Sequence, residues 1–93
     1  MTALSQRVEI VNRKGLHARA SAKLARLAAE LPNRVTVAFE GESADARSIM
    51  DLLCLGAGHG SEVTLSAEGE GAQEALHAVM DLFAEGFGEL SES

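Results

Sequence analysis

Residues 16–47 have the sequence LHARASAKLARLAAELPNRVTVAFEGESADAR, in which the spacing of the apolar residues changes midway. In the first half they recur every three or four positions, which is the spacing of one stripe of an α-helix. Pro32 and Asn33 end this helix, which we predict over residues 16–31. Over residues 34–39 the spacing becomes two, which predicts a strand with one apolar face. The apolar stripe of the helix consists of Ala20, Leu24, Leu27, Ala28 and Leu31.

Three further strands are predicted outward from this stretch. A tight turn at residues 40–42 leads from residues 34–39 into a short strand over residues 43–47. The same two-residue alternation predicts a half-buried strand over residues 4–11 and another strand over residues 62–68. Strands joined by a tight turn run antiparallel, so we expect an antiparallel sheet.

Two further helices complete the chain. Ser48 begins the first, with Asp51 three positions later as in a capping box, and Gly56 ends it. The second helix covers residues 72–87, with an apolar stripe at helical spacing. The element order β-α-β-β-α-β-α predicts an α+β fold: a four-stranded antiparallel sheet with three helices packed on one face. We expect residues 1–93 to form a single domain.

Composition excludes several classes of protein. Aromatic residues make up 3% of the chain, with no Trp or Tyr, and the net charge is −6, so nucleic acid is not an expected partner. Cys54 is the single cysteine, which rules out an internal disulfide and fits a reducing cytosol. No signal peptide and no apolar run of about 18 residues is visible, so no membrane contact is expected. The His and Cys residues lack metal-ligand spacing, and we expect a cytoplasmic monomer without a metal or cofactor.

The net charge conceals an uneven distribution. Residues 1–35 contain seven basic and two acidic residues, a net charge of +5, whereas residues 36–93 contain one basic and twelve acidic residues, a net charge of −11. The basic part predicts binding of a small anion or of an acidic partner. The acidic part is expected to keep the protein soluble and away from nucleic acid.

The motif richest in chemistry is Gly15-Leu16-His17-Ala18-Arg19, where a histidine stands at the beginning of a predicted helix. The first N–H groups of a helix have no internal acceptor and carry partial positive charge, which favours an anion there. Arg19 adds donors suited to phosphate, and a neutral imidazole at His17 has a lone pair that can attack phosphorus. On these residues alone, a helix-capping or surface histidine explains the pattern equally well.

This motif resembles the active-site motif of the histidine-containing phosphocarrier (HPr) family of the phosphoenolpyruvate-dependent phosphotransferase system. A second segment, Arg47-Ser48-Ile49-Met50-Asp51-Leu52-Leu53, resembles the regulatory-serine segment of that family. The resemblance implies that His17 accepts a phosphoryl group on Nδ1 from phosphorylated enzyme I and passes it to a histidine of an enzyme IIA. Arg19 and the backbone N–H groups of Ala18 and Arg19 would then bind the phosphoryl group. Such a protein is a carrier rather than an enzyme with its own turnover.

The second segment has a structural and a regulatory interpretation, and both can hold. Ser48 is predicted to cap its helix, which stabilises a helix by about 1 kcal/mol. The resemblance implies in addition that an HPr kinase/phosphorylase phosphorylates Ser48, and that Ile49, Met50 and Leu53 form an exposed docking patch for enzyme I and enzyme IIA. The alternative function is a regulatory module that docks through this helix without obligatory phosphotransfer.

One position departs from the family pattern. Ala20 follows Arg19, where the family commonly has Pro. Alanine is a good helix former, so we expect the beginning of the helix to survive. The run from His17 to Lys23 looks more like the nitrogen-related branch of the family than the sugar-transport branch.

Overall fold

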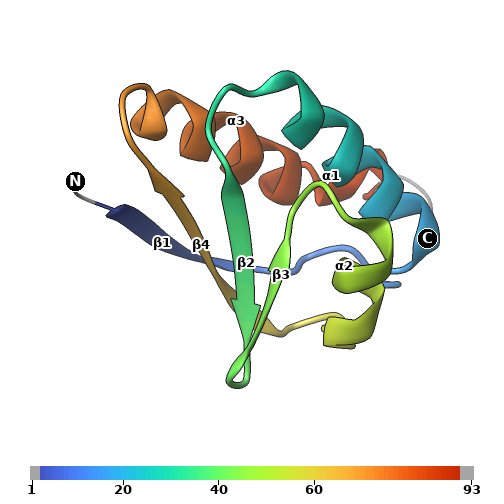
Figure 1. Ribbon diagram of the computed structural model, residues 1–93. Helices are drawn as coiled ribbons and strands as arrows, with labels where there is room; N and C mark the ends of the chain where they lie inside the picture. Colours follow the sequence, from blue (N-terminus) through green and yellow to red (C-terminus); the bar gives the residue numbers. More distant parts are fainter. Residues whose placement is uncertain (1–2, 91–93) are drawn as a thin grey trace.

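The fold is an α+β sandwich, seen in a computed structural model that describes residues 3–90 (Figure 1). Its four strands form one antiparallel sheet in the order β1-β4-β2-β3. In chain order the elements are β1 (Ala3–Glu9), α1 (Ala18–Glu30), β2 (Val35–Phe39), β3 (Glu42–Asp45), α2 (Ile49–Leu55), β4 (Glu62–Glu68), α3 (Ala72–Ala84) and the 3₁₀ turn η1 (Gly86–Gly88).

One face of the sheet carries all three helices, so the predicted fold class is confirmed. Figure 1 shows α1 and α3 lying across this face, with α2 beside the beginning of α1. Strand β4 supplies Val63, Leu65 and Ala67 to the core, and all three side chains are almost completely buried. Leu24 of α1 and Phe83 of α3 close the core from the helical side.

The last helix is shorter than its sequence pattern predicts. We expected it to run to Phe87, but α3 ends at Ala84 and Phe87 lies in η1 with a positive φ of 56°. Phe87 is nevertheless fully buried, because its ring packs edge-on against Phe83 with centroids 4.9 Å apart. The apolar spacing therefore predicts burial correctly, while Gly86 and Gly88 end the helix and turn the chain.

Two strand predictions also need correction. Strand β3, which pairs with β2 in a hairpin, covers Glu42–Asp45 rather than residues 43–47. It ends earlier than predicted because the chain leaves the sheet before the helix that begins after Ser48. Strand β1 ends at Glu9 rather than at residue 11, and it is mostly exposed rather than half-buried because it is an edge strand. Ile10, just beyond β1, is the residue that enters the core.

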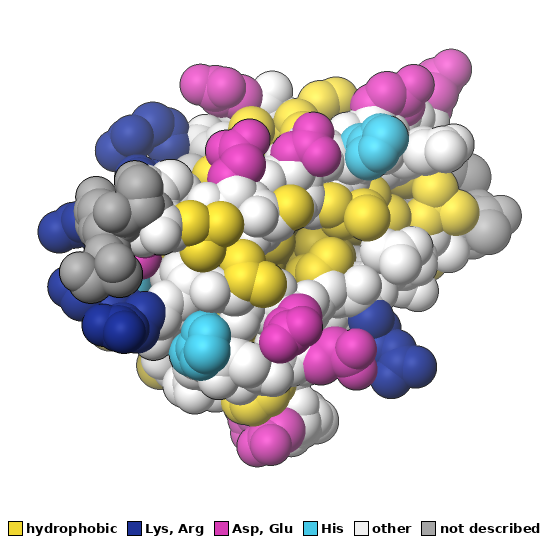
Figure 2. All heavy atoms as spheres, turned by 180° about the vertical axis from the view of Figure 1, so that it is seen from behind, with side chains coloured by type: hydrophobic (Ala, Val, Ile, Leu, Met, Phe, Trp, Pro, Cys, Tyr) yellow, Lys and Arg dark blue, Asp and Glu magenta, His cyan; other side chains and the backbone are white. Residues whose placement is uncertain are grey.

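Charge is unevenly distributed on the surface. Figure 2 shows most Lys and Arg side chains at one end of this face, while Asp and Glu side chains are spread over the rest of it with further basic atoms among them. Among these acidic side chains lies an apolar groove lined by Leu4 of β1 and by Leu76 and Met80 of α3. Over residues 3–90, no helix has the length and apolar character needed to cross a membrane.

Candidate functional site

The loop that precedes α1 is pinned to the loop that follows α2. The backbone N–H of Leu16 donates to the carbonyl of Ala57 at 3.0 Å. Gly15 has a φ of +66°, and a Cβ at this position would stand 2.6 Å from the Cα of Gly58. Glycine is required here both by the left-handed backbone and by the close approach of two chains. The position of the next residues, including His17, is therefore fixed by backbone contacts.

His17 is the N-cap of α1. Its backbone is extended, its carbonyl accepts the first helical hydrogen bond from Ser21 at 2.8 Å, and its side chain also takes part in the cap. The imidazole Nδ1 accepts a hydrogen bond from the backbone N–H of Arg19 at 3.3 Å. The first turn of α1 contains no acidic residue, so the partial positive charge of this helix end is not neutralised from within the helix.

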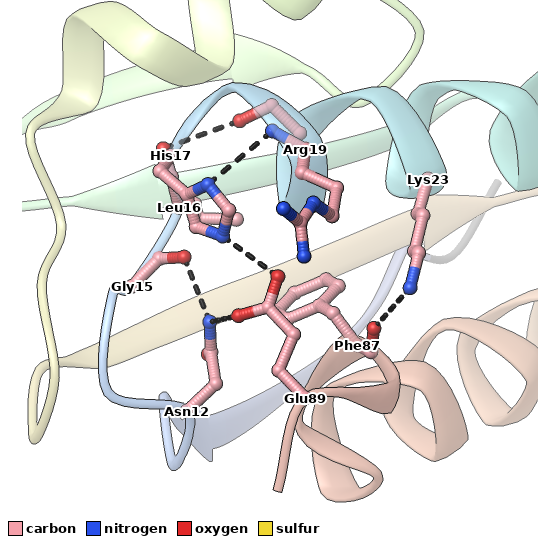
Figure 3. Close-up of polar contacts among 9 residues, drawn as sticks. Asn12, Gly15, Leu16, His17, Arg19, Lys23, Phe87 and Glu89 are labelled. Atoms are coloured by element: carbon pink, nitrogen blue, oxygen red, sulfur yellow. Dashed lines mark hydrogen bonds and ion pairs between the residues drawn. The ribbon is translucent and has the colours of Figure 1, made fainter. Parts of the chain in front are cut away.

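The opposite nitrogen of the ring contacts a carboxylate that the sequence analysis did not include. His17 Nε2 lies 2.7 Å from Oε2 of Glu89, and Figure 3 shows Glu89 reaching the ring from the C-terminal segment. The other oxygen of Glu89 accepts from Nδ2 of Asn12 at 3.0 Å, and the same amide group donates to the carbonyl of Gly15 at 2.9 Å. The side chain of Glu89 is 6% exposed, so this carboxylate is fixed in a buried place.

Electrostatics keep Glu89 ionised in spite of its burial. Desolvation by burial raises the pKa of Glu89, but this is outweighed by hydrogen bonds from Asn12 and His17, together with the positive charge of Arg19. The pKa of Glu89 consequently lies below its ordinary value. In Figure 3 the guanidinium of Arg19 lies beside the imidazole and the carboxylate. Arg19 is thus close to both groups.

These contacts define the tautomer of His17. An ionised carboxylate only accepts hydrogen bonds, so the proton between the ring and Glu89 belongs to Nε2. The backbone N–H of Arg19 only donates, so Nδ1 carries the lone pair. The nucleophilic nitrogen therefore faces the positive end of α1, where an anion would be stabilised.

The basic residue Lys23 of α1 contacts the C-terminal turn. Lys23 donates from Nζ to the carbonyl of Phe87 at 2.6 Å, so it fastens the C-terminal turn to α1 as well as adding charge.

Ala18 is exposed at the first position of α1, and Ala20 is buried in a helix whose beginning is intact, as expected. Within residues 3–90, no cluster of three or more His, Cys, Asp or Glu side chains could hold a metal ion.

Asn12 and Glu89 are the site residues that the sequence reasoning missed. No prediction from the sequence includes Asn12, and Glu89 lies within residues 36–93, the acidic part that is expected to keep the protein soluble. That assignment is wrong for Glu89, which contacts His17 across 72 positions of sequence. The pair of glycines around Phe87 is the signal that could have shown the chain turning back there.

The second predicted segment forms a separate helix N-terminus. Ser48 caps α2, accepting from the backbone N–H of Asp51 at 3.1 Å, and Gly56 ends the helix with a φ of 68°, so both local predictions are confirmed. The reciprocal half of a capping box is not formed, because the backbone N–H of Ser48 donates to the carbonyl of Asp45 at 2.9 Å.

Helix α2 buries one side and exposes the other. Leu52 and Leu55 enter the core. The three predicted docking residues are exposed: Ile49 by 41%, Met50 by 68% and Leu53 by 36%. We call these three side chains the α2 patch. Since α2 packs against α1, the patch belongs to the end of the molecule that carries His17.

Known proteins share both the sequence and the fold. Residues 4–85 match the family model described as PTS HPr component phosphorylation site. The phosphocarrier protein HPr of Cupriavidus necator is 46% identical over 86 residues, covering 92% of this chain and 97% of that protein. The phosphocarrier protein NPr of Shewanella violacea is 42% identical over 91 residues, covering 98% of this chain and 100% of that protein.

The solved structures agree with this result. HPr from Thermoanaerobacter tengcongensis superposes with a TM-score of 0.85 at 37% identity, covering 96% of this chain and 98% of its own. HPr from Bacillus anthracis superposes with a TM-score of 0.83 at 31% identity, covering 87% of this chain and 96% of its own. The chain therefore belongs to the HPr family of phosphocarrier proteins of the phosphotransferase system.

Proposed function

We propose that His17 is the residue that carries the phosphoryl group, bonded at Nδ1. The observation that supports this most strongly is the orientation of the imidazole, with its Nδ1 lone pair at the N-terminus of α1 and 3.3 Å from the backbone nitrogen of Arg19. A phosphoryl group on Nδ1 would replace the lone pair as the acceptor for this N–H group. The guanidinium of Arg19, next to the ring, would neutralise its charge.

The donor is phosphorylated enzyme I and the acceptor is a histidine of an enzyme IIA. In the first transfer the Nδ1 lone pair of His17 forms a bond to phosphorus while the donor's P–N bond breaks, and the donor nitrogen keeps that electron pair. In the second transfer the bond from His17 to phosphorus breaks in the same way. The helix terminus and Arg19 are already in position, so they stabilise the moving charge without reorganising.

The α2 patch is proposed as the docking surface for both partners. Three exposed apolar side chains lie together on a short helix beside the site, and Met50 is the most exposed of them. A flexible Met suits a surface that receives more than one partner. Phosphorylation of Ser48 by an HPr kinase/phosphorylase stays a prediction. The same patch favours the alternative function, a regulatory module that docks without transfer.

Incubation with phosphoenolpyruvate and purified enzyme I tests the proposal. We expect the wild-type protein to gain one acid-labile phosphoryl group on an Nδ1 nitrogen, identified by ³¹P NMR. His17→Ala should gain none, whereas His59→Ala and His77→Ala, which change exposed histidines elsewhere, should gain as much as wild type. Absence of uptake by wild type from a competent enzyme I would reject phosphotransfer and favour the docking module.

Arg19→Ala tests the second group of the site. The fold should be retained because Arg19 is exposed on α1, and alanine favours helix. Transfer from enzyme I should slow by roughly 100- to 1,000-fold, as expected when a donor that stabilises the charge of the transition state is removed. An unchanged initial rate would remove the Arg19 side chain from the mechanism.

A further inference from the structure

We propose that Glu89 is a positioning residue for phosphotransfer, which holds the Nε2 proton of His17 and thereby keeps the Nδ1 lone pair directed at the end of α1. This inference rests on the proposed function of His17. It adds a residue far along the chain and a specific task for the segment that follows α3.

The first argument is the hydrogen-bond geometry. Glu89 uses one oxygen for His17 Nε2 at 2.7 Å and the other for Asn12 Nδ2 at 3.0 Å. Both partners are donors, so the side chain between them has to accept at both ends. A carboxylate satisfies this requirement. A glutamine would turn its own NH₂ group toward one of the two donors and lose that hydrogen bond.

The second argument is that the carboxylate is held independently of His17. Asn12 is 1% exposed, and its amide group is oriented by the carbonyl of Gly15 as well as by Glu89. Lys23 fastens the turn at the carbonyl of Phe87, two residues before Glu89. The ring of Phe87 is itself fully buried. The C-terminal turn is thus anchored at three places, and a fixed carboxylate can orient a ring that is 25% exposed at its side chain.

The third argument concerns the charge that develops during transfer. When Nδ1 bonds to phosphorus while Nε2 keeps its proton, the ring becomes a phosphoimidazolium with a positive charge. Glu89 faces the proton on that ring, at the nitrogen opposite to the reacting one, so its negative charge complements the charge that forms. The proton stays on Nε2 throughout, and no group other than donor and acceptor nitrogens changes its bond to phosphorus.

Glu89→Gln tests this inference with a nearly isosteric side chain. In the unphosphorylated wild type we expect a downfield Nε2–H proton signal of His17 that exchanges slowly with water, and in the variant this signal should weaken or shift upfield. Initial rates of phosphotransfer from enzyme I should fall about tenfold, the lower range for loss of a group that orients a functional histidine. Backbone amide spectra check that the fold is unchanged.

Two further variants separate positioning from stability. Glu85→Gln changes an exposed acid at the end of α3, so it should leave both the proton signal and the rate as in wild type. Lys23→Met removes the fastening at Phe87 without touching His17, and it should move both readouts in the direction of Glu89→Gln by a smaller amount. A Glu89→Gln variant that transfers at the wild-type rate would overturn the inference, whatever its proton signal. Failure of wild type to accept a phosphoryl group would instead reject the proposed function.

Discussion

Two helices of this protein begin with the same cap geometry and differ in everything that surrounds it. His17 and Ser48 both have extended backbones, and both side chains accept a hydrogen bond from a backbone N–H of the first turn, at 3.3 Å in α1 and 3.1 Å in α2. Helix α2 carries Asp51 in its first turn, whereas the first turn of α1 contains no acid.

The acid in the first turn of α2 stabilises that helix, whereas the first turn of α1, which has no acid, is suited to bind an anion. In α2 the carboxylate of Asp51 already complements the helix dipole, and Ser48 supplies the neutral cap. In α1 no acid of the first turn occupies the positive end, which in the proposed function receives the phosphoryl group, and the carboxylate of Glu89 lies on the far nitrogen of the His17 ring. A phosphoryl group on Nδ1 therefore meets the helix dipole before it meets a negative charge.

Among substitutions near the two caps, Gly15→Ala is expected to have the largest effect on the free energy of unfolding. The new Cβ would meet the backbone of Gly58 at a positive φ, so about 1–2 kcal/mol of backbone strain adds to about 1–3 kcal/mol of overpacking. We expect a loss of about 3 kcal/mol in the free energy of unfolding, measured by urea denaturation. Phosphotransfer should slow as well, because the loop that holds His17 is displaced.

Gly56→Ala is the matched control for that change. Gly56 ends α2 with a φ of +68°, close to the +66° of Gly15, but a Cβ there meets nothing within 4 Å. Only the backbone strain of about 1–2 kcal/mol should remain. Equal losses of stability in the two variants would show that the close approach of the loops before α1 and after α2 adds no steric cost to the substitution at Gly15.

The two caps also differ in how far the sequence could predict them. Ser48, Asp51 and Gly56 lie within nine residues, and capping is a local interaction, so residue type and spacing suffice. The position of His17 at the beginning of α1 is likewise predicted from its motif. The polar surroundings of His17 were not, because they come from the opposite end of the chain.

The turn at Phe87 explains why Glu89 was out of reach of local reasoning. Phe87 follows Phe83 at helical spacing, so the apolar pattern extends the last helix through it. Its burial is achieved by a turn with positive φ at Gly86, Phe87 and Gly88 instead. Periodicity reports which residues are buried, and it does not report that the backbone has left the helix. Glu89 comes to lie beside His17 only because this turn packs on α1, and that tertiary contact cannot be predicted from local sequence patterns.

A smaller effect is expected from Ser48→Ala, which tests the contribution of the α2 N-cap to stability. Loss of the N-cap acceptor should lower the free energy of unfolding by about 1 kcal/mol, while the rate of transfer to His17 stays at the wild-type value. Ser48→Asp keeps an acceptor at the cap and should retain most of the stability. If Ser48→Ala slowed transfer as strongly as Arg19→Ala, the two helix termini would not be functionally separate.

The smallest effect should appear in the pH dependence of stability. Each N-cap residue contacts an acidic residue, His17 through the side chain of Glu89 and Ser48 through the backbone of Asp45. The pKa of Asp45, next to the α2 cap, is lowered by hydrogen bonds from the backbone and side chain of Arg47. The pKa of Glu89 is lowered against the opposing effect of its burial. A carboxylate with a lowered pKa in the folded state stabilises the protein above its ordinary pKa, and the stabilisation is lost as the pH falls through the folded value.

The sign of this effect makes the two acids distinguishable by titration. The ordinary pKa values are 4.5 for Glu89 and 3.8 for Asp45, so the contribution of Glu89 starts to decline at higher pH. We expect the free energy of unfolding, measured by urea denaturation from about pH 6 to about pH 3, to fall less steeply in Glu89→Gln than in wild type. Asp45→Asn should follow wild type until lower pH. Parallel curves for wild type and Glu89→Gln would mean that the ionised Glu89 carboxylate is no better stabilised in the folded protein than in the unfolded chain, and the buried contact with His17 and Asn12 would then bring no net electrostatic gain.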